Sequence, residues 1–262
     1  MIKLATPVSH LFENKDYEKI IVESSDLLEC RDKSIGYDNH VNKQELFHCE
    51  IQPIHELDET DWMFLQKIKD TKPNLKLLTL HLATCCDKPL IEGRMFKLGG
   101  REYSRKEMII FAKNNLAKIK NIFGERVDIA VENNNYYPTA AYENVTEARF
   151  ISEIVNENEL KFLFDIAHAK ITCFNKNINF EKYKKELPLD KITQIHICSY
   201  SIDNDLNQAY DAHNYPNNQE LLEVGKIISE YEGTKYLTVE YYKEIENLKK
   251  SLENLKDLIW VI

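Results

Sequence analysis

Eight short runs of apolar, β-branched or aromatic residues recur along the 262-residue chain, and segments with helical periodicity separate most of them. The runs are IKLATPV, DLLECR, ELFHCEI, LKLLTLHLA, VDIAVE, KFLFDIAHA, TQIHICS and YLTVEYY. The helical segments include residues 58–70, 105–123, 147–158, 219–231 and 244–258. Strands that alternate with helices form a parallel sheet, and eight such units close into a barrel. We therefore predict an α/β protein in which residues 1–262 form a single (β/α)8 TIM-barrel domain.

Local signals mark helix starts and one irregular unit. Ser104 stands three residues before Glu107, and Asn217 three residues before Glu220, as in a capping box. Residues 33–44 are polar and lack an apolar stripe, so we expect one barrel helix to be missing or degenerate after the second strand. A long glycine-containing connection, residues 83–103, follows a strand on the side where barrel active sites lie, and we expect it to act as a lid.

Composition argues against several classes of function. The formal net charge is −9 and no block of five like charges occurs, so general attraction to DNA or anionic lipid is not favoured. No apolar run approaches the roughly 18 residues of a membrane span. Polar and charged residues interrupt the N-terminal segment, so we expect a cytoplasmic protein with no membrane partner. The six cysteines show no C-x-x-C pair, and we expect them to be reduced.

Histidines and carboxylates fall in or just after the predicted third to eighth strands. Because barrel strand ends converge on one mouth, these side chains would face a common space. Four of them carry negative charge. Two divalent cations would balance that charge, and three would leave about two positive charges for an anionic substrate, hydroxide or bound oxygen species. Imidazole and carboxylate ligands suit Zn²⁺, Mn²⁺ and Fe²⁺. The predicted metal ligands are His48, His81, Glu132, Asp165, His168, His196, Asp211, His213 and Glu240.

Other candidate ligands are interpreted as structural. Cys49 and Cys198 lie beside predicted ligands on strands and are expected to pack in the interior. The remaining histidines, His10, His40 and His55, lie in turns or before a helix, and we treat them as non-ligands.

The order of ligands resembles the xylose isomerase-like TIM-barrel superfamily, which includes endonuclease IV and sugar isomerases and epimerases. In endonuclease IV the pattern His, His, Glu, Asp-x-x-His, His, Asp-x-His, Glu holds three metal ions. The resemblance implies that Glu132 bridges two ions. It assigns His48 and His81 to the first ion. The second ion takes Asp165, His196 and Glu240, and the third takes His168, Asp211 and His213.

In local sequence the chain is most similar to the multinuclear non-haem iron oxidative enzymes that modify peptides. The segments KFLFDIAHA, FEKYKKELPLDKITQIHICSY and YDAHNYP carry this similarity, although His168 and the ICSY after His196 depart from the pattern of that branch. The similarity implies two or three ions, with iron favoured over zinc or manganese, and a peptide or other thiol-bearing or small-molecule substrate. It leaves open a separate peptide-recognition protein as partner.

Three other functions stay open at this stage. They are an endonuclease IV-like phosphodiesterase acting on abasic DNA, a sugar isomerase or epimerase, and a metal-binding interaction protein without turnover. The catalytic candidates are Glu132, Asp165 and Glu240. Loops at a barrel mouth set specificity, so Arg94 and Tyr136 are the candidate substrate-binding residues.

Overall fold

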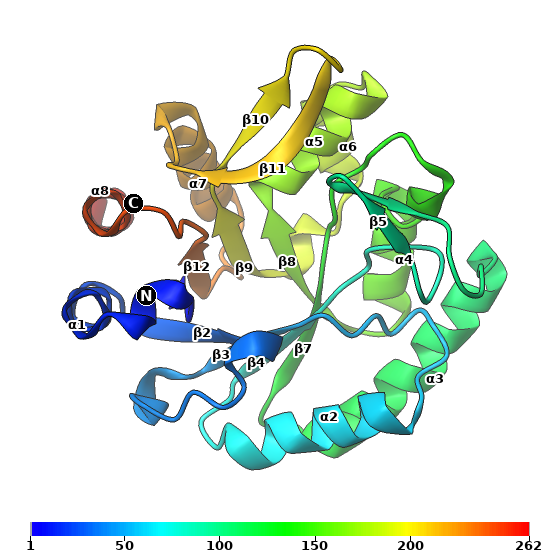
Figure 1. The fold of residues 1–262 in the computed structure, drawn as a ribbon, viewed down its shortest axis with the longest axis horizontal. Helices are drawn as coiled ribbons and strands as arrows, with labels where there is room; N and C mark the ends of the chain where they lie inside the picture. The colour runs from blue at the N-terminus through cyan, green and yellow to red at the C-terminus, as the bar shows by residue number, and fades with distance from the viewer. Residues whose placement is uncertain (1, 262) are drawn as a thin grey trace.

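The computed structural model describes residues 2–261 and shows a closed barrel of parallel strands surrounded by helices (Figure 1). The last barrel strand pairs with the first, which closes the sheet. The predicted fold class is therefore confirmed. In chain order the barrel strands are β1 (Lys3–Pro7), β2 (Leu27–Arg31), β3 (Leu46–Cys49), β4 (Leu77–Leu80), β7 (Asp128–Glu132), β8 (Lys161–Asp165), β9 (Ile192–Ile197) and β12 (Tyr236–Val239).

Helices follow the barrel strands on the outside, except after β2. There the chain forms only two short 3-10 turns, Asp32–Ser34 and Val41–Lys43, so the predicted gap in the helical layer is confirmed. The hydrophobic pattern of the sequence did not identify three of the helices, which are α1, α5 and α6. The α-helices are α1 (Lys15–Ser24), α2 (Glu59–Thr71), α3 (Arg105–Phe123), α4 (Ala148–Glu157), α5 (Ile166–Lys176), α6 (Phe180–Glu186), α7 (Asn218–Glu230) and α8 (Ile245–Val261).

Both predicted capping boxes form. Before α3, the Ser104 hydroxyl accepts a hydrogen bond from the Glu107 backbone N–H, and the Glu107 carboxylate accepts from the Ser104 N–H at 2.9 Å. Before α7, Asn217 and Glu220 make the same reciprocal pair. These bonds satisfy backbone donors that the first helical turn leaves free, and so they fix where each helix begins.

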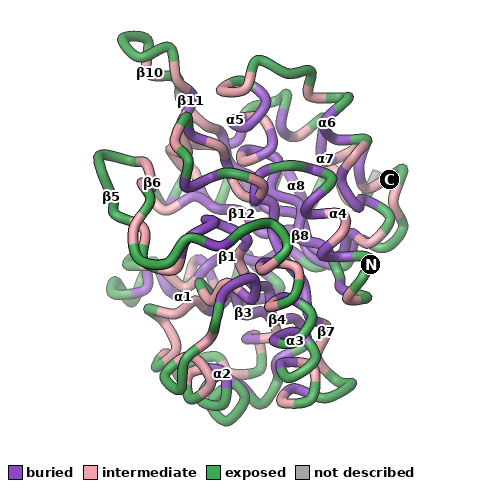
Figure 2. Tube along the Cα trace, turned by 90° about the vertical axis from the view of Figure 1, so that its right-hand side faces the viewer, coloured by how far each residue is buried: buried purple, intermediate pink, exposed green. Residues whose placement is uncertain are grey.

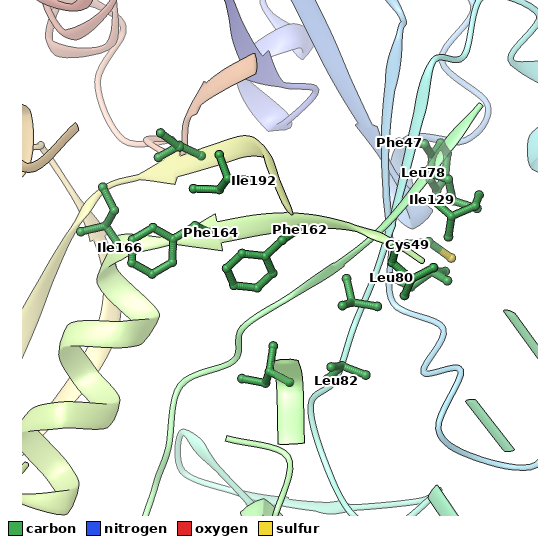
Figure 3. Packing of buried hydrophobic residues seen from close by; sticks show 14 of the residues in the cluster. Phe47, Cys49, Leu78, Leu80, Leu82, Ile129, Phe162, Phe164, Ile166 and Ile192 are labelled. Carbon is green, nitrogen blue, oxygen red and sulfur yellow. The ribbon is translucent and has the colours of Figure 1, made fainter. Parts of the chain in front are cut away.

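Side-chain alternation along the strands separates the barrel interior from its outer face. Outward residues such as Phe47, Cys49, Leu78 and Leu80 join the main hydrophobic cluster between strands and helices (Figure 3). Cys49 is thus buried packing beside His48, as the sequence indicated. Toward the amino-terminal end of the barrel strands, inward residues form a separate apolar layer, which consists of Ala5, Leu27, Leu46, Leu77, Ala130 and Tyr236.

Two hairpins rise from the mouth of the barrel. The connection 83–103 contains β5 (Leu90–Glu92) and β6 (Met95–Lys97), and the segment after β9 contains β10 (Ser199–Asp203) and β11 (Gln208–Asn214). Figure 2 shows both hairpins protruding from the same side of the molecule. The Arg94 guanidinium lies 3.7 Å from the ring centroid of Tyr210 and so connects the two hairpins. Within residues 2–261, no helix has the length and apolar character needed to cross a lipid bilayer.

Candidate metal centre

The structure brings all nine predicted ligands together at the carboxyl ends of the strands. His48, Glu132, Asp165 and His196 lie on β3, β7, β8 and β9, while His81 and Glu240 directly follow β4 and β12. Asp211 and His213 are carried by β11 of the second hairpin, and His168 lies in the first turn of α5. A cavity of about 460 Å³ opens above them, with Pro89 and Phe96 of the first hairpin region in its wall.

Glu132 presents its two carboxylate oxygens to two different sets of histidines. Its Oε2 lies 3.2 Å from His48 Nε2 and 3.7 Å from His81 Nε2. Its Oε1 lies 3.4 Å from His196 Nδ1 and 3.7 Å from His168 Nδ1. The two oxygens of Glu132 therefore face two different pairs of imidazoles.

A second set of ligand atoms surrounds His196 Nδ1. Glu240 Oε1 lies 3.3 Å from this nitrogen, Glu132 Oε1 lies 3.4 Å away, and Asp165 Oδ2 lies 4.0 Å away. One nitrogen and three carboxylate oxygens thus face a common point. Carboxylate and imidazole groups in such an arrangement are typical of a transition-metal site.

The two carboxylate oxygens of Asp165 have different roles: one caps a helix and the other faces the ligands. Oδ1 accepts a hydrogen bond of 2.7 Å from the His168 backbone N–H and so caps α5. The Asn133 side chain binds both the backbone N–H and the carbonyl of Asp165, at 2.9 Å each, and holds the strand end in place. Only Oδ2 is left to face the other ligands, so the helix cap determines the direction of the carboxylate.

The third set lies near the rim. His168 Nδ1 is 3.0 Å from the Asn133 carbonyl oxygen, which can only accept, so Nδ1 carries the proton and Nε2 is the free nitrogen. That free Nε2 lies 3.6 Å from Asp211 Oδ2. His213 Nε2 lies 3.2 Å from the same oxygen and 3.6 Å from Glu240 Oε2. Although His168 also lies close to Glu132 and Asp165, this hydrogen bond directs its available nitrogen toward Asp211.

Buried polar atoms without partners provide a test of whether the residues fit metal ions. In the described part of the chain, six buried side-chain nitrogen or oxygen atoms have no hydrogen-bond partner. Four of them are His48 Nε2, Glu132 Oε1, Asp165 Oδ2 and His196 Nδ1, all of which face the mouth centre. An unpaired buried polar atom costs about 1–3 kcal/mol. Their concentration at one place fits a site built around cations.

Ionisable side chains of like and of opposite charge lie close together in this buried site, and they shift one another's pKa values. Burial raises the pKa of the Asp165 carboxyl, and the neighbouring Glu132 and Glu240 carboxylates raise it further. Burial alone would lower the pKa of His196, but the carboxylates around it raise that pKa well above its usual range. Burial and the neighbouring His48 lower the pKa of His81 to about 3. Several carboxylates held together away from water require positive charge, which divalent ions would supply.

The depth of the ligands varies across the mouth. Asp165 and His196 have no exposed surface, whereas the side chains of His81 and His213 are 27% and 30% exposed. Asp165 and His196 are enclosed by protein, while His81 and His213, which belong to different ligand sets, open to solvent. A substrate would therefore meet these two histidines before Asp165 and His196.

The sequence interpretation missed residues beneath the centre. Glu29 on β2 is fully buried and lies with His48, His196 and Glu240 in a group whose ligand atoms are all within 4.8 Å of one another. Arg31, two residues later, binds both Glu29 and Glu240. An inward acidic residue within an apolar strand run was the signal that could have identified Glu29, because residues i and i+2 share one face of a strand.

The candidate substrate-binding residues lie farther from the centre. Arg94 is exposed at the tip of the first hairpin, and Tyr136 packs against Tyr142, with the Lys176 ammonium 4.6 Å from its ring centroid. Neither lines the cavity, although Asn134 and Asn135, next to Tyr136, do.

The remaining histidines lie outside the ligand sets, and Cys198 Sγ lies 3.9 Å from Asp211 Oδ1. His55 Nε2 donates a hydrogen bond of 2.8 Å to the Thr84 carbonyl oxygen, and the His55 ring stacks on Tyr103, whereas His40 lies 3.5 Å from Glu18. His10 lines a neighbouring cavity of about 810 Å³. Cys198 is buried, as are the other five cysteines, and all six are free thiols.

Comparison with protein families matches residues 54–259 to the model of the RiPP precursor modification enzymes MbnB/TglH/ChrH. The chain belongs to this family. Its matched region contains eight of the nine predicted ligands, all except His48. Family membership agrees with the resemblance to peptide-modifying enzymes that the sequence motifs indicated.

Curated relatives are distant. A UPF0276 protein of Vibrio parahaemolyticus is 21% identical over 145 residues, which are 55% of this chain and 49% of the relative. A UPF0276 protein of Acaryochloris marina is 24% identical over 106 residues, 40% of this chain and 37% of the relative. The chain thus spans about half or less of the length of the curated relatives that it matches.

Solved structures show the fold. A putative xylose isomerase from Rhodospirillum rubrum has a TM-score of 0.62 at 11% identity and covers 98% of this chain and 99% of its own. The 3-keto-D-glucoside 4-epimerase YcjR from E. coli has a TM-score of 0.61 at 13% identity and covers 99% and 100%. The chain therefore has the xylose isomerase-like TIM-barrel fold.

Proposed function

We propose that the chain is a multinuclear non-haem iron enzyme that oxidises a peptide at a thiol-bearing residue. The observation that carries the proposal is the arrangement of Glu132, whose two oxygens face separate histidine sets in one open mouth. A site of this form holds ions close together, and membership of a family of peptide-modifying enzymes supports a peptide as the substrate.

The nine ligands divide into three sets in this proposal. His48, His81 and Glu132 would hold one ion; Glu132, Asp165, His196 and Glu240 would hold the next; His168, Asp211 and His213 would hold the third. Iron bound by these nitrogen and oxygen ligands would bind a substrate thiolate and transfer electrons to dioxygen. The protein contributes the spacing of the ligands and the enclosure of the deeper sets.

The exposed rim gives the substrate its route. The Asp211 carboxylate and the His213 imidazole on β11 are partly exposed, and both line the cavity. A peptide residue that enters the cavity would reach this set before the buried ligands. Glu240 links the rim to the interior, because its Oε2 faces His213 while its Oε1 faces His196.

The two hairpins are the proposed contact region for the rest of the peptide or for a separate peptide-recognition protein. Leu90 and Ile91 on β5 are 59% and 72% exposed, and Leu206 in the β10–β11 turn is 67% exposed. Exposed apolar side chains on neighbouring projections favour binding to another chain. DNA is not the favoured partner, since the net charge of −9 gives no general attraction to phosphate.

The experiment measures dioxygen consumption by protein that was loaded with Fe²⁺ under anaerobic conditions. The probe is a short synthetic peptide with one Cys, and the same peptide with Ser in place of Cys is the control. We expect oxygen consumption and a change in peptide mass that require the thiol, and both should disappear in Asp165→Ala and His196→Ala. Parallel measurement of hydrogen peroxide shows whether dioxygen takes two or four electrons from the peptide.

The competing outcome is hydrolysis. Zinc-loaded protein that cleaves an abasic DNA oligonucleotide, loses this activity in the same variants and consumes no oxygen with iron would contradict the proposal. Turnover of a ketose sugar with the same residue dependence would contradict it in favour of an isomerase or epimerase.

A further inference from the structure

Glu29 lies directly beneath the metal centre and accepts an unusual number of hydrogen bonds. Its Oε2 accepts from Gln194 Nε2 at 2.6 Å, His196 Nε2 at 2.9 Å and Thr238 Oγ1 at 3.1 Å. Its Oε1 accepts from Arg31 Nη2 at 2.8 Å and Arg31 Nε at 3.1 Å. Five donors therefore occupy the acceptor sites of one carboxylate, which leaves no free lone pair for a metal ion.

The hydrogen atoms around Glu29 can be assigned from these contacts. Gln194 Nε2 carries two hydrogens, and they are directed at Glu29 Oε2 and, at 2.8 Å, at Thr238 Oγ1. No hydrogen remains for the contact of 3.1 Å between Gln194 Nε2 and His196 Nε2. His196 Nε2 must then be the donor to Glu29, and its proton lies on that nitrogen.

The other ring nitrogen of His196 faces the ions. Nδ1 is buried without a hydrogen-bond partner and is 3.3–4.0 Å from oxygens of Glu240, Glu132 and Asp165. When one imidazole nitrogen donates to a carboxylate, the second becomes the metal-binding nitrogen and the ring orientation is fixed. Glu29 thus determines which nitrogen His196 offers.

We propose that Glu29 is a positioning residue, not a metal ligand: it holds His196 Nε2–H and thereby directs Nδ1 to the metal centre. The proposal rests on the metal centre of the proposed function but needs neither iron nor oxidation. Thr238 and Gln194 support the Glu29 carboxylate from β12 and β9, and Arg31 offsets its negative charge.

The test compares Co²⁺ binding by wild type, Glu29→Gln and Thr238→Val, measured by competition with a chelating dye. Glu29→Gln replaces one carboxylate oxygen by an NH2 group, which cannot accept hydrogen bonds from the surrounding donors. The hydrogen bond from His196 Nε2 should therefore weaken. We expect the same number of ions at saturating Co²⁺, with affinity for one ion lower by about 10- to 100-fold, as for other residues that orient metal ligands. Thr238→Val removes one donor only and should weaken that ion by a smaller factor.

Glu223→Gln is the matched control. Glu223 is a buried carboxylate on α7 that binds Lys184 Nζ outside the barrel interior, so this variant should bind Co²⁺ like wild type. If Glu29→Gln and Thr238→Val also bind like wild type, the positioning role is refuted. Loss of one ion at saturating Co²⁺ in Glu29→Gln would show instead that Glu29 is a ligand.

Nitrogen NMR of Zn²⁺-loaded protein with ¹⁵N-labelled histidine provides the second readout, which does not depend on how the variants fold. We expect His196 to carry its proton on Nε2, with slow exchange because this nitrogen is buried, and to bind zinc through Nδ1. The opposite assignment of the two nitrogens overturns the inference. A wild-type protein that binds no ion overturns both this inference and the proposed function, whereas normal binding with unchanged variants overturns this inference alone.

Discussion

Replacing Glu132 by Ala should remove the ion held by His48 and His81. The deletion leaves this set with two imidazoles out of three ligands, whereas the neighbouring set keeps Asp165, His196 and Glu240. Glu132 also belongs to two of the three groups of potential ligands within 4.8 Å of one another. Removing a direct ligand should cost more than the roughly 10- to 100-fold in affinity that loss of an orienting residue costs.

The assay is the metal-to-chain ratio after loading with Fe²⁺ or Zn²⁺ and removal of excess ion. We expect the ratio of Glu132→Ala to fall by at least one relative to wild type, while the circular dichroism spectrum stays that of a folded barrel. Asp128→Asn is the matched control, because Asp128 lies at the opposite end of the same strand and pairs with Lys235. An unchanged ratio in Glu132→Ala would refute the bridging arrangement.

Three further predictions concern the hairpins, the ions and one distant carboxylate. Arg94→Ala removes the contact with Tyr210 and should raise KM for the peptide by about two- to fivefold, since an exposed cation–π contact contributes about 0.5–1 kcal/mol; the metal ratio should not change, and its loss would contradict this division. Chelation should lower Tm, because an ion at about 100 times its Kd stabilises the folded state by about 2.7 kcal/mol; an equal Tm with and without chelator would contradict binding to the folded site. Hydrogen bonds from Tyr37 and Lys15 lower the pKa of Glu18 to about 2, so its stabilisation is present above the unfolded value of 4.5 and declines as the pH falls toward 2. Glu18→Gln should therefore lower Tm at pH 7, and this deficit should shrink below pH 4.5 and vanish only as the pH falls through about 2; a deficit that is constant with pH would refute the assignment.

The barrel was predictable because its signals are local and repeated. Alternation of β-branched runs with amphipathic segments predicts the strand and helix order, and the two capping boxes mark helix starts. The short helix α5 was missed because it begins directly at Asp165, with no polar linker before it. Its start is marked only by the capping carboxylate, which the sequence interpretation treated solely as a metal ligand.

The hairpins were less predictable for a different reason. β5 and β6 have three residues each. The residues of β5 are all exposed and those of β6 are all half-buried, so neither shows the alternation of a strand with one buried face. The turn between them contains Gly93 at φ 61°, a conformation that favours glycine. That glycine was a sign of a turn, but it did not distinguish a hairpin from an irregular lid.

The metal centre illustrates what residue type and position together reveal. Histidines at strand ends identify the ligands at the mouth of the barrel, because polar rings in apolar strands are unusual. The supporting layer was hidden because Gln194 and Thr238 are ordinary polar residues in strands. Each lies two positions before a ligand, His196 or Glu240, and this spacing places it below that ligand on the same strand face.

The central claim is that this mouth holds a multinuclear iron centre that reacts with dioxygen. Its most direct test is the iron content of anaerobically loaded protein, together with its Mössbauer spectrum before and after exposure to oxygen and the Cys-bearing peptide. We predict at least two irons per chain, in distinct environments because the deep and rim ligand sets differ, and spectral change that requires the peptide thiol. A single iron per chain, or two irons whose spectrum does not respond to peptide and oxygen, would contradict the claim.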